Sequence, residues 1–515
     1  MSEALEVAGC IAAAASAALA LLTSDSRLRA AGLLLAMGFA TALIAGQGWD
    51  DIQTLRDHPA AFAAAIAGAV VILILIAAAM LRWPILLPLL IVATLPFRIR
   101  LHVAGGQAVN LLVPLYVVLG AGVLATAVDA VRHAAPPRAI PRPLVLALVV
   151  VIVLYALQSI YSEDVAFAAR NMGFFVAPFA VLFSLLAQAE WDRRLLRLAF
   201  AVVLAEGLVL ALIGIGQFAG EHIFWNGKLE ASNDFHFYFR VNSLFWDPNI
   251  YGRYLMLSIL LGTAALTWAS DRRLALALTA VIGVVFVGLL FGFSQTTFFA
   301  LFVGLAVLVA LRWSVRWAAV ATPLALAGIV LAVIAIGSGS GESTRTVTEG
   351  HSSLVSGGVK LAEHRPIWGY GSASFSKAFA RAEDVRAGDT TISHTEPVTV
   401  AAEQGVVGIV AYVALLAAAL WTVFGGMRSI APGLGAPFRQ FRDGNRAELG
   451  PARIAIAAAF LALLVHTIGY AAYLTDPLTW ALLAVGAVLA AEAGAGGWPA
   501  ALLPASGEGT RQSPG

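Results

Sequence analysis

The chain has 515 residues, of which 60% are hydrophobic and 12% are charged, and its formal net charge is +2. A water-soluble domain carries about twice this share of charged residues, so the composition excludes a soluble globular protein and indicates a polytopic membrane protein. The mean hydropathy of +0.86 agrees with this. The small net charge gives no indication of nucleic-acid binding. The single cysteine, Cys10, excludes an internal disulfide and a thiolate metal site.

Apolar segments recur along the whole chain, and we read each as a membrane helix. Several are shorter than the roughly 20 residues needed to cross a bilayer. The expected fold is therefore all-α: a polytopic membrane protein with about 12 to 15 transmembrane helices and one large extracytoplasmic loop. The candidate spans are 7–22, 30–46, 60–81, 84–97, 108–128, 144–160, 172–187, 196–217, 249–268, 274–291, 296–312, 317–336, 397–424, 454–473 and 478–491.

Polar composition divides the chain into five regions. The tail is rich in Gly, Pro, Ala and Ser, a composition typical of disorder. The regions are N-terminal transmembrane helices (1–217), transmembrane helices that carry an Arg and an Asp-Pro-Asn motif (218–336), a polar extracytoplasmic loop (337–396), C-terminal transmembrane helices (397–491) and a disordered cytoplasmic tail (492–515).

The positions of Arg and Lys predict the orientation, because short cytoplasmic connections carry these residues in excess. With the N-terminus outside, nineteen of the 32 basic residues fall on the cytoplasmic side. Six of the other thirteen belong to the 337–396 loop, where the rule does not apply. The loop is therefore expected on the outer face.

The first candidate site motif precedes the span at 249–268. Asp247 is a good N-cap and Pro248 a good first helical residue, so we expect the helix to begin there. Asn249 and Arg253 then lie on one face, with Arg253 about 7 Å inside the helix. Arg253 either extends outward or pairs with Asp247, or it brackets an anionic group together with Arg240, since guanidinium groups bind phosphate oxygens bidentately.

Two further polar stretches lie on the same expected face. The segment 294–297, Ser-Gln-Thr-Thr, is a polar turn that caps a helix. The segment 364–375 is a helix end followed by a glycine turn, in which Gly369 and Gly371 permit unusual backbone angles. This turn lacks the strand and the Lys-Ser/Thr pair of a nucleotide loop, so we expect an architectural role for it.

The polar loop ends in Ser393-His394-Thr395-Glu396-Pro397. Proline disfavours helical geometry at the residue before it, so Glu396 is the expected N-cap of the next helix. A neutral His394 beside that helix start could accept the proton of a sugar hydroxyl. The alternative is an exposed loop histidine without a role.

Other polar residues fall within or beside the apolar spans, and such residues are functional candidates in a membrane protein. Their spacing predicts no continuous relay. They are Gln158, Glu206, His466, Tyr470 and Tyr473.

From Arg240 to about Leu420, these motifs in this order resemble the O-antigen ligase and O-antigen polymerase family of bacterial membrane glycosyltransferases. The pieces are an Arg, Asp-Pro-Asn with a following Gly, Phe-Ser-Gln-Thr at a helix start, the large loop with Gly-Tyr-Gly, and His394 followed by Glu-Gln-Gly-Val-Val-Gly at 403–408. The N-terminal half contributes only helices to the resemblance.

The resemblance implies a GT-C-like enzyme of the bacterial plasma membrane with its active site on the extracytoplasmic side. Such an enzyme moves a glycan from a polyprenyl-diphosphate carrier to a hydroxyl of an acceptor glycan or glycolipid, without a metal or other cofactor. The implied partners are these two substrates and the lipid bilayer, with no nucleic acid.

By the same resemblance, Arg240 stabilises the leaving diphosphate, His394 is the general base, and Glu396 orients the histidine or binds the acceptor. Asp247, Asn249 and Gln295 are the remaining expected substrate contacts. Many family members carry Ser-Arg where this chain has Ser294-Gln295, so one expected positive charge is missing. Either Arg253 or Arg345 supplies it, or the donor is held differently.

Two other functions fit a polytopic chain with polar residues at membrane depth. A transporter or flippase for lipid-linked saccharides is one, although no duplicated half is visible and the polar residues gather on one face. A non-catalytic envelope scaffold with a degenerate site is the other, and Gln295 keeps this alternative open. The sequence does not separate ligase from polymerase, nor does it identify the sugars.

Overall fold

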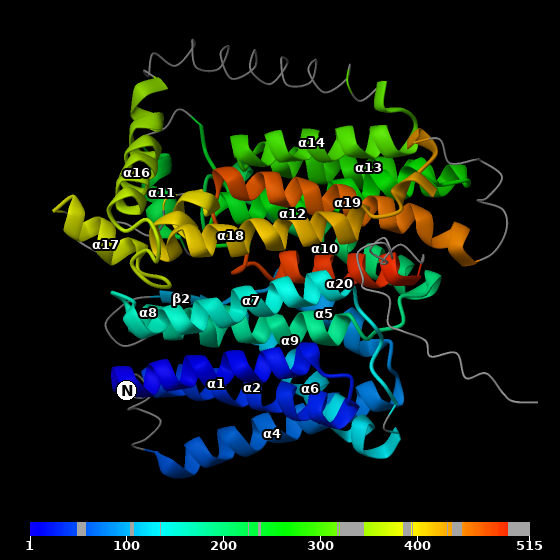
Figure 1. The fold of residues 1–515 in the computed structure, drawn as a ribbon. Coiled ribbons are helices and arrows are strands. Elements are labelled where there is room, and N and C mark those ends of the chain that lie inside the picture. Colours follow the sequence, from blue (N-terminus) through cyan, green and yellow to red (C-terminus); the bar gives the residue numbers. More distant parts are fainter. Residues whose placement is uncertain are drawn as a thin grey trace, which may run out of the picture.

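The computed structural model shows a bundle of helices that run back and forth side by side (Figure 1). Twelve described helices or helical segments are long and apolar enough to cross a membrane. The protein is thus a multi-pass membrane protein built almost entirely of helices, as the composition predicted. The structure describes residues 1–48, 58–102, 108–133, 135–224, 226–234, 238–316, 319, 344–384, 393, 395–429, 431–434 and 445–492.

The first half of the chain forms one side of the bundle, apart from α10 (Arg193–Gly220), which packs on α12 (Pro248–Thr267) and α13 (Arg272–Leu290) of the second half (Figure 1). Its elements are α1 (Glu3–Leu22), α2 (Ser26–Gln47), α4 (Pro59–Arg82), α5 (Leu86–Thr94), β1 (Ile99–His102), β2 (Ala108–Leu111), α6 (Val113–His133), α7 (Arg142–Gln158), α8 (Val165–Asn171), a π-helical turn at Met172–Val176, α9 (Ala177–Leu186) and α10 (Arg193–Gly220).

The second half forms the other side and carries the long polar segment. Its elements are α11 (Gly227–Asn233), α12 (Pro248–Thr267), α13 (Arg272–Leu290), α14 (Gln295–Arg312), α16 (Thr344–His364), α17 (Phe375–Ala382), α18 (Glu396–Phe424), α19 (Asn445–Gly469) and α20 (Pro477–Glu492). Helix α20 is shorter than the other spans and is almost wholly buried against α9, α18 and α19.

Helices that face the lipid expose apolar side chains, whereas central helices bury theirs. On α4, Val70, Ile74 and Leu75 are exposed by about half or more of their surface. On α12, every residue from Tyr251 to Gly262 is buried. A transmembrane helix contacts lipid through such apolar side chains, so α4 lies at the edge of the bundle and α12 at its centre.

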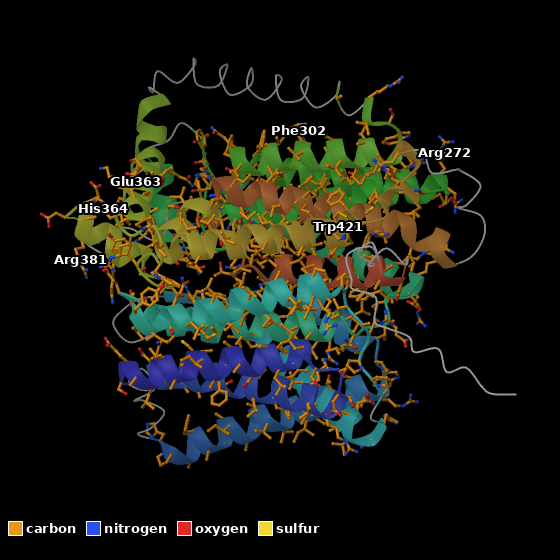
Figure 2. All side chains as sticks on the ribbon, viewed as in Figure 1. Arg272, Phe302, Glu363, His364, Arg381 and Trp421 are labelled. Atoms are coloured by element: carbon orange, nitrogen blue, oxygen red, sulfur yellow. The ribbon has the colours of Figure 1, made fainter. Side chains whose placement is uncertain are left out.

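The two ends of the bundle differ in character. We call the end that carries α11, α16 and α17 the loop end, and the opposite end the arginine end. Figure 2 shows Glu363, His364 and Arg381 at the loop end and Arg272 at the arginine end. The N-terminus also lies at the loop end (Figure 1).

Two expected spans differ from the structure. The segment 84–97 forms only the nine-residue α5, and 108–128 begins with β2, so that α6 starts at Val113. Strands β1 and β2 pair antiparallel, with Ile99 opposite Leu111. Apolar composition predicted a helix here because it does not distinguish a helix from a short hairpin. The expected span 317–336 lies outside the described residues apart from residue 319, and so does the tail from residue 493.

The polar region 337–396, which we expect to be an extracytoplasmic loop, contains two helices in its described part. Helix α16 ends at His364, as the sequence predicted, and α17 follows the glycine turn. The buried side chains of Leu361, Phe375 and Phe379 pack together with Ala402 of α18. The region is therefore anchored on a membrane helix.

Candidate functional site

The glycine turn fills a break in α18. Gly405 has a φ of +63°, so the regular helical hydrogen bonds are interrupted there. The backbone N–H groups of Tyr370 and Gly371 donate to the carbonyls of Ala402 and Glu403, at 3.1 and 2.8 Å. The Val406 N–H donates back to the carbonyl of Pro366 at 2.7 Å. The turn therefore satisfies groups that the break leaves without a helical partner.

A buried carboxylate fixes the same turn. The two oxygens of Glu403 accept hydrogen bonds from the backbone N–H groups of Ala373 and Phe375, at 2.9 and 3.1 Å. On the other side, Ser162 donates to the carbonyl of Ser372 at 2.7 Å. The glycine turn thus joins the C-terminal half to the loop after α7, and the structure gives it the expected architectural role.

The start of α12 agrees with the sequence prediction. Asp247 is the N-cap, and its side chain accepts a hydrogen bond from the Asn249 N–H at 2.6 Å. Pro248 is the first helical residue. Asn249 stands half-buried at the second helical position, at the loop end of the bundle.

Arg253 lies in a different environment from either of those expected. Its side chain is 1% exposed and forms an ion pair with Asp476, not with Asp247. Nη1 also donates to the carbonyl of Ala472 at 3.4 Å, and Nη2 to that of Tyr470 at 3.2 Å. All the guanidinium nitrogens have protein partners once His466 is included, so Arg253 is a structural cation and not an open phosphate contact.

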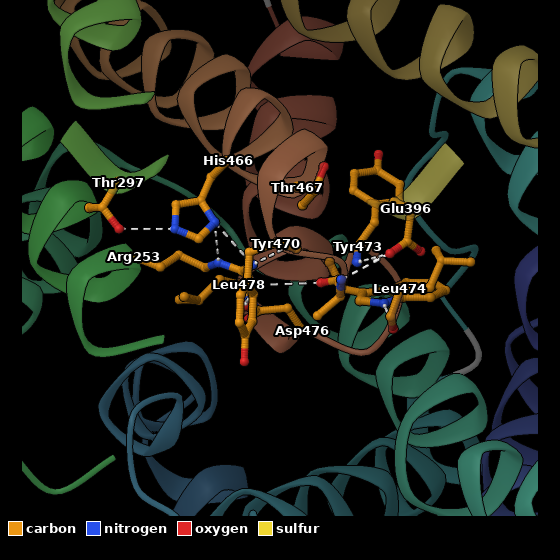
Figure 3. A network of polar contacts seen from close by, with 12 residues as sticks. Arg253, Thr297, Glu396, His466, Thr467, Tyr470, Tyr473, Leu474, Asp476 and Leu478 are labelled. Carbon is orange, nitrogen blue, oxygen red and sulfur yellow. Dashed lines mark hydrogen bonds and ion pairs between the residues drawn. The ribbon is translucent and has the colours of Figure 1, made fainter. Parts of the chain in front are cut away.

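His466 connects Arg253 to the hydroxyl group of Thr297 (Figure 3). Its Nδ1 lies 3.3 Å from Nε and 3.1 Å from Nη2 of Arg253, and its Nε2 lies 3.0 Å from Oγ1 of Thr297. Thr297 donates to Ser294 at 2.8 Å, and Ser294 donates to Oδ1 of Asn249 at 2.6 Å. We call Asn249, Arg253, Ser294, Thr297, His466 and Asp476 the polar cluster.

Asp476 was missed by the sequence analysis. Its side chain accepts a hydrogen bond from the Leu478 N–H at 2.9 Å and so caps α20. The signal that would have found it is Asp476-Pro477, which repeats the Asp247-Pro248 pattern at the start of α12. Both aspartates begin helices at the loop end.

Glu396 is the first residue of α18, and Thr395 is the N-cap, which corrects the expected cap position. Oε2 of Glu396 accepts hydrogen bonds from the backbone N–H groups of Ala472 and Tyr473, at 2.9 and 3.2 Å. Figure 3 shows these contacts beside the polar cluster. Glu396 therefore ties α18 to the turn between α19 and α20. His394 lies outside the described residues.

Arg240 is half-buried in the segment that leads to α12. Asn233 at the end of α11 holds its backbone through two hydrogen bonds of 3.0 Å. Nε of Arg240 donates to the carbonyl of Gly292 at 3.4 Å. Within the described part of the chain, this is the one contact of its side chain, and its two terminal nitrogens make no hydrogen bond or ion pair there.

The other expected contacts differ in position. Gln295 is the first residue of α14 and is exposed, directly after the N-cap Ser294. The backbone of Arg345 belongs to α16, but its side chain lies outside the described residues. Among the described residues, no group of three or more His, Cys, Asp or Glu lies together in a way that could hold a metal.

Two tyrosines follow α19 beside the polar cluster. The Arg253 guanidinium lies over the Tyr470 ring, 5.5 Å from its centroid. Burial raises the pKa of Tyr470, the negative charge of Asp247 raises it further, and Arg253 acts in the opposite direction. Burial likewise raises the pKa of Tyr473. Both hydroxyls stay protonated and can donate hydrogen bonds at neutral pH.

A scan against models of known protein families finds no match, and a search of curated proteins finds none either.

Proposed function

We propose that this protein is a glycosyltransferase that moves a glycan from a polyprenyl-diphosphate carrier to an acceptor hydroxyl at the outer face of a bacterial plasma membrane. One observation carries the proposal. The hydrogen bond between Ser294 and Asn249 joins two of the motifs that resemble the O-antigen ligase and polymerase family, at 2.6 Å. Arg240, a third, contacts the carbonyl of Gly292 two residues before Ser294.

The charge distribution supports the orientation. Basic residues such as Arg193, Arg194, Arg197 and Arg272 begin helices at the arginine end, and cytoplasmic connections carry such residues in excess. The loop end, with the polar cluster, then faces outward. A lipid-linked glycan held in the outer leaflet presents its diphosphate at the level of the loop end.

In the proposed reaction, the acceptor hydroxyl oxygen attacks the anomeric carbon of the donor glycan. The bond from that carbon to the diphosphate oxygen breaks, and its electron pair leaves with the diphosphate. His394 takes the hydroxyl proton. The terminal nitrogens of Arg240 stabilise the negative charge that develops on the diphosphate.

The structure changes the residue roles that the resemblance implied. Arg253 already has an anionic partner in Asp476, so it does not replace the charge missing at Gln295. Arg240 is the one described arginine that we assign to the diphosphate, and the charge missing at Gln295 is not replaced by a second one among the described arginines. Asn249 donates hydrogen bonds from its side-chain amide to the diphosphate of the glycan substrate. Glu396 supports the turn after α19.

Reconstitution in vesicles tests the function. The purified protein is supplied with an undecaprenyl-diphosphate-linked oligosaccharide and a labelled acceptor oligosaccharide, and the coupled product is measured. We expect product, and at least about a tenfold loss of rate in Arg240→Ala because a charge-assisted hydrogen bond to the leaving group is removed. Lys228→Ala, which removes an exposed charge from α11 at the same end, is the control.

The two alternative functions give different results in the same vesicles. A transporter moves the intact lipid-linked glycan across the bilayer and forms no new glycosidic bond. A scaffold does neither. Either result contradicts the proposal.

A further inference from the structure

We propose that His466 is a positioning residue: it sets the direction of a hydrogen-bond chain through Thr297 and Ser294, so that the Asn249 amide turns its N–H groups toward the diphosphate of the donor. The inference rests on the proposed function, because the diphosphate is the group that Asn249 contacts. Neither the motifs nor their spacing assigned a role to His466 or Thr297.

Arg253 sets the direction of the hydrogen-bond chain. A guanidinium has N–H donors and no acceptor, so Nδ1 of His466, 3.1 Å from Nη2, must accept. The imidazole hydrogen is then on Nε2, which lies 3.0 Å from Oγ1 of Thr297 and donates to it. The contacts with Arg253 therefore fix the tautomer of His466, with the hydrogen on Nε2.

Two hydroxyl groups continue the hydrogen-bond chain. Thr297 accepts from His466, and its own hydrogen goes to Ser294 at 2.8 Å. Ser294 accepts this hydrogen bond and a second one from the Thr297 backbone N–H at 3.4 Å. Since a hydroxyl oxygen has two lone pairs, Ser294 can only donate to Asn249.

The last hydrogen bond of this chain, from Ser294, determines the orientation of the Asn249 amide. The atom of Asn249 that faces Ser294, at 2.6 Å, must be the carbonyl oxygen Oδ1. Its nitrogen Nδ2 therefore points away from Ser294. An amide side chain is otherwise free to present either atom, so His466 decides whether Asn249 offers a donor or an acceptor. The anionic diphosphate accepts hydrogen bonds, so Asn249 must present the N–H groups of its amide to it.

The Arg253 end of the hydrogen-bond chain is anchored in the protein core. Asp476 holds Arg253 in a buried ion pair, and its other carboxylate oxygen is held by the Leu478 N–H. Gly252 of α12 packs directly on the Thr297 hydroxyl, where a Cβ would lie 2.7 Å from Oγ1. The glycine of the Asp-Pro-Asn motif therefore allows the close contact that keeps Thr297 in line.

The test compares Thr297→Val with Thr297→Ser. Valine keeps the shape and removes the hydroxyl, whereas serine keeps the hydroxyl. Binding of fluorescent undecaprenyl diphosphate to the full-length protein in nanodiscs is measured, together with KM and kcat for transfer. Thermal unfolding of each variant checks that it is folded.

We expect Thr297→Val to weaken binding of the probe by about tenfold, the effect of one hydrogen bond to a charged group. The KM for the donor should rise by a similar factor while kcat changes less. Thr297→Ser should restore both values. His466→Gln should retain more binding than His466→Leu, because an amide can accept from Arg253 and donate to Thr297.

Two results overturn the inference and separate it from the proposed function. If the native protein binds the probe and Thr297→Val binds it equally well, or Thr297→Ser is as weak as Thr297→Val, the positioning role is wrong and the glycosyltransferase proposal stands. If the native protein does not bind the probe at all, both are wrong.

Discussion

Arg253 of α12 and Asp476 before α20 form an ion pair in which the two side chains are only 1% and 3% exposed. Removal of one partner would leave the other charge buried and without compensation. Buried pairs broken in this way lose about 3–5 kcal/mol. This pair, part of the polar cluster, therefore links the central helix α12 to the last helix, α20.

Asp476→Ala should accordingly lower the free energy of unfolding by about 3 kcal/mol or more. Thermal unfolding in detergent measures this. The matched control is Glu492→Ala at the arginine end, where the pair with Arg138 has side chains 29% and 31% exposed. An exposed pair contributes about 0–1 kcal/mol. Equal losses in the two variants would show that the buried pair has no special role.

Gly405 provides a second stability test. Its φ of +63° is unfavourable for a residue with a Cβ, and a Cβ there would overlap the backbone of Ile367 and Trp368. Gly405→Ala should cost about 2 kcal/mol or more and undock the glycine turn. In contrast, Gly283→Ala on the lipid-facing side of α13, where a Cβ meets nothing within 4 Å, should be neutral or stabilising by up to about 1 kcal/mol. A tolerated Gly405→Ala would contradict the close contact.

The helix starts illustrate what the sequence could predict. Asp247 and Ser294 cap their helices as expected, because capping depends on a few adjacent residues. The apolar spans were found for the same reason, since hydrophobicity over about 20 residues is a local property. The residue range of α5 and the β1–β2 hairpin were not found, because apolar composition alone does not distinguish these structures.

The polar cluster shows what the sequence could not predict. Arg253 and Asp476 are more than 200 positions apart, and their contact depends on how α12, α19 and α20 pack. His466 was noted as a polar residue of a membrane span, but its partners come from α12 and α14. Spacing along one helix therefore gave no relay, although the packed helices form a continuous one.

The orientation is tested with single cysteines. Cys10 is fully buried, so the native background for labelling is low. We expect Lys360→Cys on α16 to react with an impermeant maleimide in intact cells, and Arg272→Cys at the start of α13 to react only after the membrane is permeabilised. Both side chains are exposed. The reverse pattern would place the polar cluster on the cytoplasmic side.

The central claim is that this protein forms a glycosidic bond with His394 as the general base. The most direct measurement is the rate of glycan transfer by purified His394→Ala in the reconstituted assay, compared with His364→Ala, which removes an exposed histidine at the end of α16. We expect at least about a hundredfold loss for His394→Ala, the usual contribution of a general base, and the native rate for His364→Ala. Transfer at the native rate by a folded His394→Ala would contradict the account.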